Sequence, residues 1–272
     1  MRTALKKIIP FTLGQKLRGL WQKTQAVYYR GNNYTCPFCG NSFRKMLPGG
    51  FDLPVIREKQ IVGAGRREND VCPRCYSIDR DRLIYLYLTN KTDSLKAPIK
   101  LLHIAPGGAL RAFLSGRDNI EYHMGTKHHE GFYYTKDISI IDITEINYPD
   151  NTFDVVLCNH VLEHIPEDLK AMHELYRVLK PGGWAILQVP ISKILEKTFE
   201  DESVTSSKER EKIFGQFDHV RIYGQDYPDR LAKAGFDVHI HNPVKEQWNI
   251  NNINRFAINK EENLFVAHKP KK

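Results

Sequence analysis

The chain has 272 residues, of which 41% are hydrophobic and 26% are charged. These proportions are typical of a folded globular protein and exclude a disordered, collagen-like or coiled-coil chain. The sequence contains no run of about 18 apolar residues, so it predicts no transmembrane helix.

Positive charge is concentrated at the N-terminus. The first acidic residue is Asp52, and nine of the 40 Lys and Arg residues precede it. Apolar residues recur at helical spacing from Leu13 to Tyr28, which predicts a basic amphipathic helix within a segment of residues 1–33. We expect its apolar stripe to pack on the protein's own body. Contact of this helix with an anionic membrane surface, or of its charges with RNA phosphate, is the alternative.

Four of the five cysteines form two CxxC pairs in a segment of residues 34–97. The pairs are Cys36 with Cys39 and Cys72 with Cys75. Each tight turn directs two thiolates at one ion, so the pairs predict a closed, structural zinc site. Because few core residues lie between the pairs, zinc would supply much of the folding free energy of this module. A redox pair is the alternative.

The fifth cysteine, Cys158, lies in an apolar strand and is expected to be a buried core thiol. An odd number of cysteines and the lack of a secretory signal argue against a disulfide framework. They favour a reducing compartment, so we expect a cytoplasmic protein.

The pattern changes after a predicted helix at 79–90 and a polar linker at 90–97, and we place a domain boundary there. Residues 98–272 alternate apolar strands with helices. The expected strands are 101–105, 120–124, 138–142, 153–159, 184–189, 236–241 and 264–268, and the expected helices are 108–116, 167–180 and 225–234. This alternation predicts an α/β fold with a Rossmann-like, seven-stranded, mostly parallel sheet flanked by helices.

The first strand of this region runs into a turn of small residues. Ala105, Gly107 and Gly108 follow an apolar stretch and precede a predicted helix. At the carboxyl end of the first strand of an open α/β sheet, such a turn lets backbone N–H groups approach a cofactor. Alone the motif is weak, because it is not a strict GxGxG.

Residues 142–190 carry the most specific pattern, in the stretches Phe153–Val156, Val161–Ile165 and Leu179–Gly183. From about residue 100 to residue 269 the chain resembles the class I S-adenosylmethionine-dependent methyltransferases, in the group of small-molecule and ubiquinone-biosynthesis enzymes. Zinc-knuckle cysteines ahead of such a domain are similar to a bacterial subgroup often found with surface-glycan genes. The resemblance implies methyl transfer from S-adenosylmethionine to a small-molecule or saccharide acceptor.

The resemblance implies cofactor contacts by residues that follow the first four strands. They are His103, Ala105, Gly107 and Gly108 near the methionine end, Thr126 near the ribose, Asp142 and Ile143 near the adenine, and Asn159 near the sulfonium. His103 and Thr126 stand where the family usually has acids. Because a hydroxyl makes only a neutral hydrogen bond, we expect modest cofactor affinity. Glu130, in the loop after Thr126, is a candidate substitute.

Other residues are candidates for the acceptor side. Neutral imidazole accepts protons near neutral pH, so His160 and His219 are candidate proton acceptors. Arg221 and Tyr223 are candidates for holding an anionic or sugar acceptor. Glu163 and His164 are expected to fix the turn before the next helix rather than to contact substrate.

Two other functions compete with this one. A zinc module before a methyltransferase domain also resembles certain ribosomal-RNA guanine methyltransferases, and a basic N-terminus suits phosphate. Against RNA, the rest of the chain is nearly neutral, with 31 basic and 32 acidic residues. The two missing acids favour a third function, a non-catalytic cofactor-binding scaffold on a degenerate methyltransferase fold.

Overall fold

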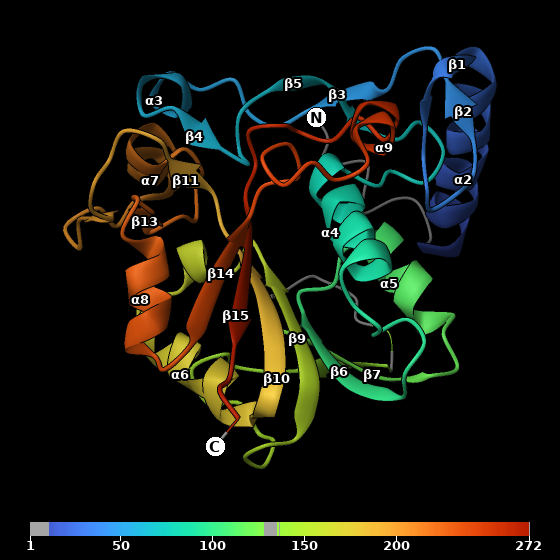
Figure 1. Ribbon diagram of the computed structural model, residues 1–272. Coiled ribbons are helices and arrows are strands. Elements are labelled where there is room, and N and C mark those ends of the chain that lie inside the picture. The colour runs from blue at the N-terminus through green and yellow to red at the C-terminus, as the bar shows by residue number, and fades with distance from the viewer. Residues whose placement is uncertain (1–10, 128–134, 136, 272) are drawn as a thin grey trace.

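The computed structural model describes residues 11–127, 135 and 137–271 (Figure 1). A central sheet carries helices on both faces, and the N-terminal part of the chain crosses the end of the sheet where the parallel strands have their carboxyl ends. We call this end the sheet edge.

The central sheet has seven strands in the order β14-β15-β10-β9-β6-β7-β8. The strands are β6 (Ile99–Ile104), β7 (Ile120–Thr126), β8 (Ile138–Ile140), β9 (Phe153–Asn159), β10 (Leu179–Gln188), β14 (Asp237–His241) and β15 (Leu264–His268). Only the two pairs that include β15 are antiparallel, and the other four pairs are parallel. The predicted seven-stranded, mostly parallel sheet is therefore confirmed. The strand order reverses at β6, and a crevice for ligands opens at such a point.

Two buried clusters hold the helices against the sheet. The helices are α4 (Asp79–Asn90), α5 (Gly108–Ser115), α6 (Asp168–Val178), α8 (Tyr227–Lys233) and α9 (Ile250–Arg255). Val155 of β9 packs in the cluster with α4, α5 and α9, and Val156 packs in the cluster with α6 and α8. Successive strand residues point to opposite faces, so alternate residues of one apolar strand supply both layers.

The N-terminal part is built from short elements. They are α2 (Phe11–Tyr28), β1 (Arg30–Thr35), β2 (Ser42–Phe43), β3 (Leu47–Gly49), α3 (Pro54–Glu58), β4 (Ile61–Val62) and β5 (Arg67–Val71). β1 pairs with β2 and β3 with β5, each antiparallel. Phe43 and Met46 are fully buried beside the cysteines, so the apolar core of this part is small.

The apolar stripe of α2 lies largely in solvent. Leu13, Leu17, Leu20 and Trp21 are between 48% and 64% exposed. The expectation that this stripe packs on the protein's own body is therefore wrong for these side chains. In the part of the chain that the structure describes, no helix is both long and apolar enough to cross a membrane.

Contacts across the sheet edge join the N-terminal part to the rest of the molecule. β4 pairs antiparallel with β11 (Ile191–Ser192), which follows β10. Arg82 of α4 is fully buried and donates hydrogen bonds to the backbone carbonyls of Ser77, Asp70 and Phe256. The remaining short elements on this side are η1 (Leu162–His164), β12 (Phe199–Glu200), α7 (Ser207–Phe214) and β13 (Arg221–Ile222).

Candidate functional site

Strand register aligns several predicted cofactor residues. Ile104 of β6 is in register with residues of both β7 and β9, and the residues that follow on the three strands are Ala105, Thr126 and Asn159. Asp142 follows β8, the next strand along the edge. The sheet thus brings these four positions to one edge, beside the point where the strand order reverses.

The turn after β6 is shaped for close approach by a ligand. Ala105 has a left-handed backbone with φ of 49°, which is uncommon for a residue with a Cβ and turns the chain sharply after the strand. Gly107 and Gly108 are exposed at the start of α5. A Cβ added to Gly108 would meet no atom within 4 Å. Open space thus adjoins the backbone N–H groups that begin α5.

A carboxylate from α4 lies beside this turn. An added Cβ on Gly107 would lie 3.8 Å from Oδ1 of Asp81. The other oxygen of Asp81 accepts a hydrogen bond from the backbone N–H of Ile78 at 3.1 Å and caps α4. Burial raises the pKa of Asp81. Sequence reasoning missed this acid, because it lies in the helix before the first strand rather than in the turn motif.

His103 and Asp142 have contrasting environments. His103 is 2% exposed, its Nδ1 lies 2.8 Å from the hydroxyl of Tyr122, and burial lowers its pKa to about 3. It is therefore a neutral side chain inside the sheet. Asp142 is exposed and accepts hydrogen bonds from the backbone and hydroxyl of Thr144, which lower its pKa. The next residue, Ile143, is buried in the core.

These residues fit the methionine end of S-adenosylmethionine. Oδ1 of Asn159 is buried and has no hydrogen-bond partner among the described residues, so a ligand donor such as an ammonium group would satisfy it. The start of α5 suits a carboxylate. Glu130, the candidate substitute for the ribose acid, lies outside the described residues.

A cavity of about 400 Å³ lies between the N-terminal part and the sheet edge. We call it the module cavity. Its lining includes Gly63, Arg80, His160, Glu163, His164 and His219. Both predicted proton acceptors therefore border one cavity, and so do Glu163 and His164, which were expected only to fix a turn.

His160 follows β9 directly and faces the N-terminal part. Its φ is 53°, and a Cβ added to Gly63 would lie 3.4 Å from Cε1 of its ring. Nδ1 lies 3.2 Å from Oε1 of Glu163, while Nε2 is buried without a hydrogen-bond partner in the described chain. Burial lowers the pKa of His160 well below its usual value. The ring is therefore neutral.

Glu163 and His219 are also buried in the wall of the module cavity. Glu163 is 1% exposed, and burial raises its pKa to about 8. Neither of its carboxylate oxygens accepts a hydrogen bond of normal geometry from the described residues. The His219 ring lies 4.7 Å from that of His164, edge to face, and burial lowers the pKa of His219 to about 4.

Arg80 brings a positive charge to the module cavity. Among the described residues its guanidinium makes no hydrogen bond and no ion pair. Arg80 lines the cavity, and the next residue, Asp81, lies beside the turn after β6. His160 also lines the cavity, and the residue before it, Asn159, is one of the predicted cofactor residues. The module cavity therefore adjoins the candidate cofactor site, which we call the cofactor edge.

Arg221 and Tyr223 are held by protein partners. Arg221 is 3% exposed, and its guanidinium donates to Glu200 and to the carbonyls of Leu162 and Pro166. Tyr223 is fully buried, and its hydroxyl donates to Asp168 at 2.8 Å. With these donors already used, the contacts favour a structural role for both side chains over the predicted contact with an acceptor.

The four paired cysteines form one cluster. Their sulfur atoms all lie within 4.8 Å of one another, with Sγ of Cys36 3.5 Å from that of Cys75 and Sγ of Cys39 3.8 Å from that of Cys72. Tetrahedral zinc with bonds of about 2.3 Å needs sulfur atoms about 3.8 Å apart. The four thiols therefore fit a closed zinc site.

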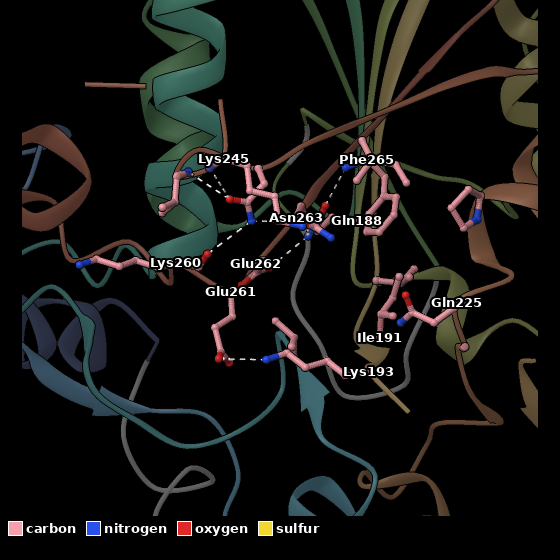
Figure 2. A pocket seen from close by; sticks show the side chains of 17 residues that line it. Gln188, Ile191, Lys193, Gln225, Lys245, Lys260, Glu261, Glu262, Asn263 and Phe265 are labelled. Carbon is pink, nitrogen blue, oxygen red and sulfur yellow. Dashed lines mark hydrogen bonds and ion pairs between the residues drawn. The ribbon is translucent and has the colours of Figure 1, made fainter. Parts of the chain in front are cut away.

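A second cavity, of about 420 Å³, lies beside β10, β14 and β15 (Figure 2). Its polar groups bond to each other: the Asn242 amide donates to Asn263 at 2.9 Å, and Gln188 donates to the Asn263 carbonyl at 2.6 Å. Lys193 and Glu261 form an ion pair at 2.9 Å. Because these groups are satisfied, this cavity shows less sign of a ligand than the module cavity.

Part of the chain is similar to known proteins. Residues 122–187 match the profile of a family described as a methyltransferase domain. A ubiquinone/menaquinone biosynthesis C-methyltransferase of Hydrogenovibrio crunogenus is 39% identical over 67 residues, which are 25% of this chain and 26% of that protein. A demethylmenaquinone methyltransferase of Listeria welshimeri is 46% identical over 39 residues, or 14% of this chain and 16% of that protein.

The chain spans about a quarter or less of the length of these curated relatives. Among solved structures, phosphoethanolamine N-methyltransferase 2 of Haemonchus contortus, in complex with S-adenosylmethionine, is 19% identical. Its TM-score is 0.44, over 71% of this chain and 53% of that chain.

Proposed function

We propose that this protein, which carries a segment of the methyltransferase-domain family, is an S-adenosylmethionine-dependent methyltransferase whose acceptor binds in the module cavity. One observation carries the proposal. Asn159 and His160 are consecutive at the end of β9, with an unpartnered oxygen of Asn159 at the cofactor edge and the His160 ring in the module cavity. Methyl transfer needs donor and acceptor in contact, and this arrangement supports it.

The residues at the cofactor edge have distinct roles in this proposal. The open backbone at Gly107 and Gly108 receives the carboxylate of the methionine end. Asn159 and Asp81 accept hydrogen bonds from its ammonium group, and Asp81 replaces the acid that β6 lacks. Asp142 accepts a hydrogen bond from the adenine amino group. The cofactor supplies a methyl group on a positively charged sulfur, so the protein has chiefly to align the two reactants.

The acceptor side needs a proton acceptor when the attacking atom carries a proton. His160 and His219 are the candidates, because both lie in the wall of the module cavity and both rings are neutral. Neutral imidazole would take the proton while the acceptor's electron pair forms the new bond to the methyl carbon. The bond between that carbon and the sulfur would break at the same time, and S-adenosylhomocysteine would leave.

The module cavity favours a small acceptor with an anionic group. Its volume of about 400 Å³ is in the range of small-molecule sites. Arg80 is a donor to a carboxylate or phosphate there, since its guanidinium has no ion pair among the described residues. A saccharide that carries such a group satisfies both conditions. An RNA substrate would instead need an open, basic surface.

The cysteine cluster supports a structural zinc ion as a second part of the proposal. Four thiolates leave no open coordination position, so this ion would hold the N-terminal module rather than take part in methyl transfer. The module in turn supplies part of the cavity lining, including Gly63.

Binding of S-adenosylhomocysteine tests the proposed function. The product should raise the melting temperature, because it binds the native state. Asp142→Ala should weaken binding about tenfold or more, as for a lost hydrogen bond to a charged group. The control is Asp237→Ala. Asp237 is an exposed residue of the outer strand β14, so its loss should leave the affinity for S-adenosylhomocysteine unchanged.

Turnover of the methyl donor with cell extract, fractionated into RNA, glycans and small molecules, identifies the acceptor class. Methylation of a small anionic molecule or glycan supports the proposal. Methylation confined to RNA overturns the acceptor assignment, and a folded protein with no thermal shift at millimolar product favours a non-catalytic scaffold.

A further inference from the structure

We infer that Glu163, His164 and His219 form a binding site for a divalent transition-metal ion in the wall of the module cavity. One ligand atom of each residue lies within 4.8 Å of the other two. An ion with bonds of about 2.0–2.2 Å holds its ligand atoms about 3–4 Å apart, so side-chain movements of about 1 Å complete the site. This site is separate from the cysteine cluster.

The burial of Glu163 without hydrogen-bond donors in the described chain is independent evidence for a bound ligand. Its side chain is 98% buried, yet neither carboxylate oxygen accepts a hydrogen bond of normal geometry from the described residues. Nδ1 of His160 lies 3.2 Å from Oε1. A buried carboxyl group without partners is costly, and a cation bound by it removes that cost.

Neighbouring side chains contact both imidazoles. Nδ1 of His164 lies 3.3 Å from Oδ2 of Asp218, and the His219 ring packs edge to face against the His164 ring, with 4.7 Å between the ring centroids. A histidine that binds a metal commonly gives its other ring N–H to a carboxylate or a carbonyl. His164 therefore has a neighbouring carboxylate of this kind.

The donor set indicates the kind of metal. Two imidazoles and one carboxylate suit Zn²⁺, Fe²⁺ or Mn²⁺, whereas Mg²⁺ and Ca²⁺ prefer oxygen ligands. Three protein ligands leave coordination positions open to the module cavity, unlike the four thiolates.

If the proposed function holds, an oxygen atom of the acceptor fills one of these positions, and the ion lowers the pKa of a bound hydroxyl. His219 is then a ligand, and His160 remains the proton acceptor. This consequence rests on the proposed function, but metal binding itself does not.

Titration with Mn²⁺, followed by electron paramagnetic resonance, tests the site in the 272-residue chain prepared with no more than one zinc ion per chain. Mn²⁺ favours nitrogen and oxygen ligands, so it competes poorly for four thiolates. The wild type should bind about one Mn²⁺ per chain, and Glu163→Gln and His219→Ala should each weaken binding about 10-fold to 100-fold or more. His239→Ala is the matched control, because its half-exposed ring lies on β14, at the far edge of the sheet.

Wild-type protein that binds no Mn²⁺, or variants that bind it as the wild type does, overturn the site. Tighter binding of Mg²⁺ than of Mn²⁺ overturns the choice of metal. The thermal shift with S-adenosylhomocysteine, measured on the same variants, shows that they are folded. It also separates the two proposals: a protein that binds Mn²⁺ but not S-adenosylhomocysteine retains the metal site and loses the proposed function.

Discussion

The buried carboxyl groups of this protein differ in whether they accept hydrogen bonds. Asp168 is 2% exposed, and it accepts hydrogen bonds from Tyr223 and from Arg230. Glu163 is equally buried but has no such donors in the described chain. A folded protein normally satisfies its buried polar groups, so an exception that lines a cavity marks a place where a ligand completes the structure.

Glu262 allows the effect of burial on stability to be tested at a single residue. It is 2% exposed, and burial raises its pKa to about 7. The folded state therefore binds the proton more tightly than the unfolded state, and stability falls as pH rises from about 4.5 to 7. Glu262→Gln removes this titration and retains an oxygen that can accept from Gln188.

We expect Glu262→Gln to be more stable than the wild type at pH 8, by about 1–3 kcal/mol. The difference should shrink toward pH 5. Denaturant unfolding at both pH values measures it, with Glu261→Gln as the exposed control. A constant difference across this pH range would contradict the assignment of the titration to Glu262.

Some site residues were predictable from sequence because their signal is local. The CxxC pairs and the residues that follow β9 belong to short, recognisable motifs. Arg80, Asp81 and Gly63 carry no such signal, because they reach the site through contacts with residues distant in sequence. Gly63, for example, is recognisable only from the ring of His160 that lies against it.

Elements with a strong apolar period were predictable, and very short strands were not. The helix expected at 79–90 is α4, and the seven expected strands all occur in the central sheet. β4 and β11 have two residues each and pair with each other. Two residues cannot show a period, so the join between the N-terminal part and the sheet edge is not visible in the sequence.

The cysteine cluster gives a prediction for the elements around it. β1, β2, β3 and β5 enclose a core in which Phe43 and Met46 are the buried large apolar side chains, so metal binding should contribute most of their stability. Cys72→Ser should hold one zinc less per chain than the wild type and lose the fold of this module.

Elemental analysis and proteolysis measure these two effects. Cys158→Ala is the control, since its thiol is buried in the sheet core and should affect stability without changing the zinc content. A wild-type protein that is stable and free of metal would refute the zinc site.

At the scale of the whole molecule, α4 packs as part of the α/β body. Leu83, Leu86 and Leu88 of this helix are buried in one cluster with Leu101 of β6 and Leu110 of α5. The sequence pattern changes near residue 98 because strands and helices begin to alternate there. This change does not show that the preceding helix packs on the sheet.

We therefore expect a fragment of residues 98–272 to be unstable on its own, since it exposes the sheet face that α4 covers. A fragment of residues 79–272 should retain more native structure. Circular dichroism and binding of a hydrophobic dye distinguish the two, and a stable, monomeric 98–272 fragment would show that α4 is dispensable.

The join between the N-terminal part and the sheet edge also affects how the chain folds during synthesis. Ser192 donates to the carbonyl of Lys59, and Arg82 donates to that of Phe256, across 133 and 174 residues. The ribosome therefore releases the cysteine module long before the segments that it contacts have been made. Until residues 192 and 256 have been translated, the proposed zinc ion would be the main constraint on this module. We therefore expect the supply of the ion to the nascent chain to affect the yield of native protein.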